Sequence, residues 1–90
     1  MRIETTDGDI FVLMPYEEAG SEKDKQRNVF RISSAGEVRW QIAAYPAQPA
    51  LSTFTKIAWN GEYLSAYNFD GALYRIDPNN GSVIGSSFLK

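Results

Sequence analysis

The sequence contains no cysteine and no histidine among its 90 residues. Without cysteine there are no disulfides, thiolate metal ligands or cysteine nucleophiles, and without histidine there is no Ser-His triad and no histidine pH switch. We therefore expect no catalytic centre of these classes, no classical zinc site and no enzyme. Apolar packing must stabilise the fold, and aromatic residues, at 13% of the chain, supply large side chains for it.

Long apolar runs and an excess of positive charge are also missing. The apolar stretch from Ile10 to Met14 ends at Pro15 and is far shorter than the roughly 20 residues that cross a bilayer. The first ten residues are polar and charged, unlike a secretory signal, so we expect a cytoplasmic protein without a membrane segment. The formal net charge of −2 is unlike that of a basic nucleic-acid-binding surface, and nucleic acid is not an expected partner.

Short β-branched and aromatic runs alternate with glycine-containing turns along almost the whole chain. Val38, Trp40 and Ile42 alternate with polar residues, which is the period of a half-buried strand. Asn60-Gly61 is the dipeptide most typical of a tight type I′ hairpin turn. We expect strands at residues 2–6, 10–14, 29–33, 37–43, 53–59, 62–68, 72–77 and 82–88.

Two segments interrupt this pattern. Residues 15–27 begin with Pro15 and are polar, so we expect an exposed loop with at most one short helical turn. Residues 44–52 contain Pro46 and Pro49 and are expected to connect two units. The chain is thus expected to form a single domain, residues 1–90, with a first unit at 1–43, a connector at 44–52 and a second unit at 53–90.

An internal repeat supports this division. Val29-Phe30-Arg31-Ile32 and Leu73-Tyr74-Arg75-Ile76 match in kind at four positions, and each is followed by a turn that contains glycine, at Gly36 or Gly81. The offset between Phe30 and Tyr74 is 44 residues, the period of a four-stranded propeller blade. We predict an all-β fold of two four-stranded antiparallel meander sheets, packed as part of a propeller or as a sandwich.

The same alignment selects a candidate core. Phe30, Ile32, Tyr74 and Ile76 fall on one face of equivalent strands, and we expect that face to be buried in both units. The other expected core residues are Val38, Trp40, Ile42, Phe54, Leu64, Ala66, Val83 and Phe88.

The segment from Leu73 to Ile84 resembles the strand-turn-strand element of quinoprotein-type β-propeller blades, in which a pattern of the kind LYxIDPxTGxV recurs. Asn80 stands in the place usually taken by threonine. The resemblance covers residues 54–88 well and residues 28–42 weakly. It implies a blade-like sheet but no quinone, because that cofactor needs a closed ring of blades and two units form at most part of one. We expect no cofactor and no metal.

The charge is unevenly distributed. Residues 1–24 hold seven acidic and two basic residues, whereas residues 25–90 hold four acidic and seven basic ones. One interpretation is a solvated loop; the other is an acidic patch that steers a basic partner into place, with aromatic anchors nearby. On the second interpretation, the candidate partner-binding residues are Glu17, Glu18, Glu22, Asp24, Trp59 and Tyr67.

In size, acidity and β content the chain is similar to small bacterial immunity proteins of contact-dependent growth inhibition systems. This similarity is one of type and not of a motif. It implies a small non-catalytic binding protein that neutralises a toxin, with a basic toxin domain such as a nuclease as its partner. Two alternatives stay open: a small-ligand or carbohydrate binder that uses exposed Trp and Tyr, and a structural module that oligomerises, as a homodimer or a larger propeller-like assembly.

Overall fold

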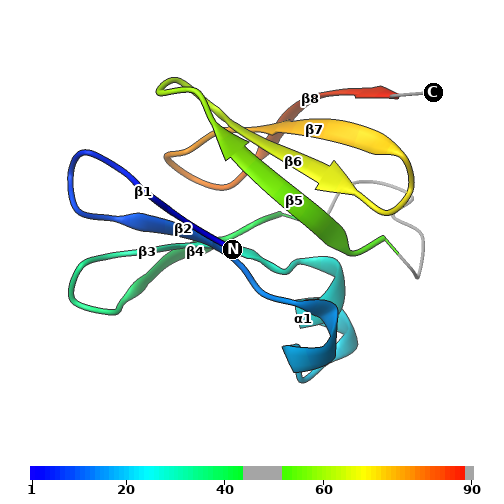
Figure 1. The fold of residues 1–90 in the computed structure, drawn as a ribbon, viewed down its shortest axis with the longest axis horizontal. Helices are drawn as coiled ribbons and strands as arrows, with labels where there is room; N and C mark the ends of the chain where they lie inside the picture. The colour runs from blue at the N-terminus through cyan, green and yellow to red at the C-terminus, as the bar shows by residue number, and fades with distance from the viewer. Residues whose placement is uncertain (44–51, 89–90) are drawn as a thin grey trace.

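Two four-stranded antiparallel sheets make up the molecule in the computed structural model, which describes residues 1–43 and 52–88 (Figure 1). The first sheet contains β1 (Arg2–Glu4), β2 (Ile10–Leu13), β3 (Val29–Ile32) and β4 (Val38–Gln41) in sequence order. The second contains β5 (Phe54–Trp59), β6 (Leu64–Asn68), β7 (Ala72–Ile76) and β8 (Val83–Phe88), again in sequence order. The predicted all-β class and both meander sheets are confirmed. All but residue 52 of the predicted connector lies outside the described residues.

Side chains that bond to the backbone shape the turns between the strands. The Asn60 side-chain oxygen accepts hydrogen bonds from the backbone N–H groups of Glu62 and Tyr63, at 2.8 and 2.9 Å. Trp59 pairs with Leu64, so four residues connect β5 to β6. The predicted two-residue type I′ turn is therefore wrong, because Asn60 closes a longer loop through its side chain.

The segment between β2 and β3 is more ordered than expected. It contains the 3₁₀ helix η1 (Tyr16–Glu18) and the short helix α1 (Glu22–Gln26), where we expected a loop with at most one helical turn. Ser21 caps α1, because its hydroxyl oxygen accepts a hydrogen bond from the backbone N–H of Asp24 at 3.1 Å. Within the described residues, no helix is long and apolar enough to cross a bilayer.

The two sheets share one register. Phe11 pairs with Arg31 and Arg31 with Trp40, just as Ser65 pairs with Arg75 and Arg75 with Gly85. Each sheet also has an irregularity at the same place, after Arg31 in the β3–β4 pair and after Arg75 in the β7–β8 pair. The sequence repeat thus corresponds to a structural repeat that includes the bulge.

The two sheets nevertheless bury opposite faces. We call the face of each sheet that packs against the other sheet its inner face, and the opposite face its outer face. The inner face of the first sheet carries the buried residues Phe11, Leu13, Val29, Trp40 and Ile42. The inner face of the second carries the buried residues Phe54, Ile57, Leu64, Ala66, Tyr74 and Ile76. Equivalent sheets that bury opposite faces are stacked front to back, so that the front of one repeat packs on the back of the other.

This stacking corrects part of the predicted core. Tyr74 and Ile76 are buried, but Phe30 and Ile32 lie on the outer face of the first sheet and are only half-buried. Val38 lies on the same face and is 59% exposed. The prediction for these three residues is wrong, because it assumed that both repeats bury the same face. Trp40, Ile42, Phe54, Leu64 and Ala66 are buried as predicted, and Val83 packs partly buried against the core.

The turn between β7 and β8 joins the two sheets. The Pro78 carbonyl accepts hydrogen bonds from Arg31 Nη1 at 2.7 Å and from Trp40 Nε1 at 2.8 Å. Gly81 has a φ of 78°, and a Cβ placed on it would lie 2.7 Å from the Trp40 ring. The turn that resembles a blade motif therefore fits under Trp40 only with glycine at this position.

Candidate functional site

A hollow near the predicted binding segment is a groove between η1 and the start of β5, which we call the η1 groove. It measures about 360 Å³. Its lining residues are Met1, Leu13, Met14, Pro15, Tyr16, Glu17, Thr53, Phe54 and Thr55. Both sheets contribute, because the chain leaves β2 at Leu13 and enters η1 through Pro15, beside the first residues of β5.

The floor of the η1 groove is apolar and its rim is polar. Leu13 and Phe54 are buried at 8% and 3% exposure, while Tyr16 and Glu17 are exposed at the rim. The ammonium group of Lys25 lies 4.7 Å from the centre of the Tyr16 ring and makes a cation–π contact with one face of the ring. The Thr53 hydroxyl is buried and has no hydrogen-bond partner within residues 1–43 and 52–88.

Asn28 keeps the two sides of the groove together. Its side-chain amide donates hydrogen bonds to the carbonyls of Met14 and Phe54, at 2.8 and 2.9 Å. Its side-chain oxygen accepts a hydrogen bond from the Phe54 backbone N–H at 2.9 Å. Asn28 is completely buried, so these bonds form away from water and fix β5 to the end of β2.

The four acidic candidate residues have different surroundings. Glu17 lines the η1 groove, and Glu18 follows it at the exposed end of η1. Glu22 is the first residue of α1. The Asp24 carboxylate accepts a hydrogen bond from Gln41 Nε2 at 2.9 Å, which attaches α1 to β4. Glu17 is therefore the candidate acid that lines the groove among the described residues, and Glu18 is its neighbour in sequence.

The structure does not bring the two aromatic candidates to the acidic segment. Trp59 is at the far end of β5 from Phe54, roughly 17 Å away along the strand. Its ring packs 5.0 Å from that of Phe11, between the two sheets. Tyr67 belongs to the outer face of the second sheet, where the Lys56 ammonium lies 5.5 Å from its ring centre.

A cluster of charged residues that our sequence analysis missed lies at the other end of the first sheet. Asp9 is buried, and its Oδ2 accepts hydrogen bonds from Arg31 Nε at 2.8 Å and Arg39 Nε at 2.6 Å. Arg31 also pairs with Asp7 at 2.9 Å. The sequence interpretation counted Asp7 and Asp9 among the acids of a possible patch, but the fold pairs both with arginine. The signal was the alternation of Arg31 and Arg39 with apolar strand residues.

These contacts change the acidity of both carboxyl groups. The hydrogen bond from Arg39 is the main cause that holds the pKa of Asp9 below its usual value, and Arg31 contributes further. The Thr5 hydroxyl is the main cause of the lowered pKa of Asp7. Both carboxyl groups are ionised at neutral pH and bonded within the molecule. No group of three or more potential metal ligands gathers in the described part of the chain.

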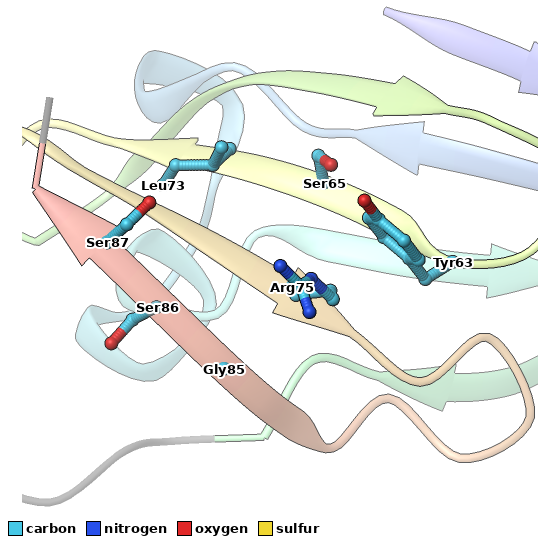
Figure 2. A pocket seen from close by; sticks show the side chains of 7 residues that line it. All are labelled: Tyr63, Ser65, Leu73, Arg75, Gly85, Ser86 and Ser87. Carbon is cyan, nitrogen blue, oxygen red and sulfur yellow. The ribbon is translucent and has the colours of Figure 1, made fainter.

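A smaller hollow lies on the outer face of the second sheet (Figure 2). It measures about 70 Å³ and is lined by Tyr63, Ser65, Leu73, Arg75, Gly85, Ser86 and Ser87. We call it the Tyr63 hollow. The Arg75 guanidinium lies 4.8 Å from the centre of the Tyr63 ring and covers one side of it. Pockets for small ligands usually measure about 300–1,000 Å³, so this hollow is too small for a typical one.

A family model matches residues 2–88, from the first residue of β1 to the last residue of β8. The chain belongs to the family DUF7957, a domain of unknown function. The DUF7957 match covers both sheets, η1 and α1, and so includes the η1 groove apart from Met1. A search of curated proteins found no match to the chain.

Proposed function

We propose that this DUF7957 protein is a non-catalytic binding module that docks a basic protein partner in the η1 groove. In its most specific form it is a cytoplasmic bacterial immunity protein that neutralises a cationic toxin domain of a contact-dependent inhibition system. The observation that carries the proposal is the groove itself. Its apolar floor is bordered by Glu17, the only charged side chain among the described residues that line it.

The groove has the anatomy of a small protein interface, with an apolar centre and a polar rim. An apolar side chain of the partner packs over Leu13 and Phe54. A lysine or arginine beside it reaches Glu17, with Glu18 adding to the attraction at longer range.

The Tyr63 hollow supports the carbohydrate alternative less well. A sugar stacks on an uncovered aromatic face, but the Arg75 guanidinium lies over the Tyr63 ring. The hollow is also much smaller than the η1 groove, at about 70 Å³ against about 360 Å³. We therefore assign the binding function to the groove.

The test is a comparison of association rates for two charge reversals. Glu17→Lys changes the groove rim, and Glu62→Lys makes the same change in the exposed β5–β6 loop, away from the groove. The probe is the basic toxin domain that the proposal predicts to be encoded beside this chain's gene. Because rim charges act mainly on the association rate, Glu17→Lys should slow association about tenfold at low salt. Glu62→Lys should stay within about twofold of the unchanged chain.

Salt dependence separates electrostatic steering from a packing defect. At 1 M salt the screening length falls to about 3 Å, and the rates of the three proteins should converge. Equal association rates for Glu17→Lys and Glu62→Lys at low salt would overturn the proposal. So would the absence of binding between the unchanged chain and the toxin domain.

A further inference from the structure

The stacking of the two sheets leaves the outer face of each sheet uncovered. Within the chain, the inner face of the first sheet packs on the inner face of the second. When the two sheets are aligned by their strand register, these inner faces are opposite sides of the repeat. Such a front-to-back stack has no two-fold axis, and a further sheet can pack on either end of it in the same way. The outer face of the first sheet is equivalent to a face that is buried in the second, and the reverse also holds.

The outer face of the first sheet has an apolar centre on β2, β3 and the start of β4, whereas Arg2 and Glu4 on β1 and Gln41 on β4 are polar. Its apolar residues are Ile10, Val12, Phe30, Ile32 and Val38. Their equivalents in the second sheet are Leu64, Ala66, Tyr74, Ile76 and Val83, which are buried or packed against the core. In the first sheet the same five positions remain partly in water, and Val38 is 59% exposed. A contiguous apolar face of this kind marks an interaction surface.

The outer face of the second sheet has some of the same residue types as the equivalent face of the first sheet, which is its inner face. Arg75 stands where the first sheet has Arg31, and Tyr67 and Leu73 stand where it has Leu13 and Val29. Ser65 and Gly85 are small where Phe11 and Trp40 are bulky, which produces the Tyr63 hollow (Figure 2). This face has room for bulkier opposing residues, and the outer face of the first sheet has Val12 where the second has Ala66.

We propose that a second copy of this chain covers these faces, so that the chains assemble head to tail. The outer face of the first sheet of one copy packs on the outer face of the second sheet of the next. Head-to-tail contacts form a ring when the rotation closes. Four-stranded sheets close at about four to eight per ring, which corresponds to about two to four chains. The η1 groove belongs to neither face, so this assembly goes beyond the proposed binding function.

The contact between the two sheets of one chain predicts which residues meet between neighbouring chains. Arg31 donates to the carbonyl of Pro78 in the β7–β8 turn. The same arrangement brings Arg75 to the β3–β4 turn of the neighbouring copy, where Ser34 is equivalent to Pro78 and exposed Glu37 follows. Arg75 thus meets a carboxylate. Around Gly36 of that turn, no atom lies within 4 Å of a built Cβ, whereas Trp40 covers the equivalent Gly81.

The test measures the mass of the full chain in solution by light scattering. A single chain has a mass of 10.1 kDa, and we expect two to four times this mass at micromolar concentration. Val38→Lys should reduce the particle to the single-chain mass. Phe69→Lys is the matched control, because Phe69 is 68% exposed in a turn outside both faces and its replacement should leave the assembly intact.

A charge exchange tests the head-to-tail geometry itself. Arg75→Glu and Glu37→Arg should each weaken the assembly, and the two changes in one chain should restore it, since every contact then regains one charge of each sign. A 10.1-kDa particle for the unchanged chain would overturn the proposal. A dimer that Val38→Lys dissociates but Arg75→Glu leaves intact would also overturn it, because that pattern indicates a two-fold contact through the first sheet alone. Circular dichroism of each variant identifies any that fail to fold.

Discussion

Arg31 and Arg75 show how one residue type takes two roles at equivalent strand positions. Arg31 lies under the second sheet, where its side chain is 13% exposed and bonds to Asp7, Asp9 and the Pro78 carbonyl. Arg75 is exposed and rests over the Tyr63 ring. The repeat predicted that the two positions match, but the sequence alone could not predict which of them a second sheet covers.

Because the Asp9 carboxylate is bonded to two arginines, the stability of the fold decreases at acidic pH. Its pKa in the folded state is lowered, chiefly by Arg39, so its contribution is complete above the unfolded-state value of about 3.9. That contribution is lost as the pH falls from there through the lower folded-state pKa. Urea unfolding at pH 7, 5, 4 and 3 should show little change down to pH 5 and a steep loss below pH 4.

Two variants assign that loss to Asp9. Asp9→Asn cannot ionise, so its free energy of unfolding should fall less between pH 5 and pH 3 than that of the unchanged chain. Glu62→Gln removes an exposed carboxylate and should keep the original acid dependence. Parallel curves for Asp9→Asn and the unchanged chain would exclude Asp9 as the source.

At the scale of elements, local sequence predicted the strands well and their connections less well. All eight strands form within their expected ranges, because alternation and turn residues act locally. The order between β2 and β3 was underestimated. The Ser21 cap is a local signal that the sequence interpretation overlooked, whereas the Asn28 bonds to Met14 and Phe54 depend on neighbours that a sequence does not place. The β7–β8 turn was predicted as a turn, but its contact with Trp40 comes from the other repeat.

Gly81 tests that contact between elements. Gly81→Ala places a methyl group 2.7 Å from the Trp40 ring and forces alanine to a φ of 78°. Gly61→Ala is the control, because Gly61 has a φ of 91° but open space around it. Both variants bear backbone strain of about 1 kcal/mol, and Gly81→Ala adds an overpacking penalty of about 1–3 kcal/mol. Equal free energies of unfolding for the two variants would show that Trp40 does not pack against this turn.

At the scale of the molecule, the choice of buried face decides both proposed surfaces. The sequence predicted two equivalent sheets that bury the same face, and this was wrong for the first sheet because both of its faces carry apolar residues. Front-to-back stacking places Trp59 between the sheets and leaves Tyr67 on an outer face. It also brings the start of β5 beside η1, which joins residues about 40 positions apart in the η1 groove. Of the candidate binding residues, Glu17 lines this groove and Glu18 follows it in η1.

The most direct test of the proposed function is a map of the surface that a partner contacts. The ¹⁵N-labelled chain is titrated with the toxin domain that the proposal predicts beside its gene, and backbone amide shifts are followed by NMR. We predict the largest changes at Tyr16, Glu17 and Thr55, around the η1 groove. Changes confined to Ser65, Arg75 and Ser87 on the outer face of the second sheet would contradict the account, and so would a spectrum that does not change.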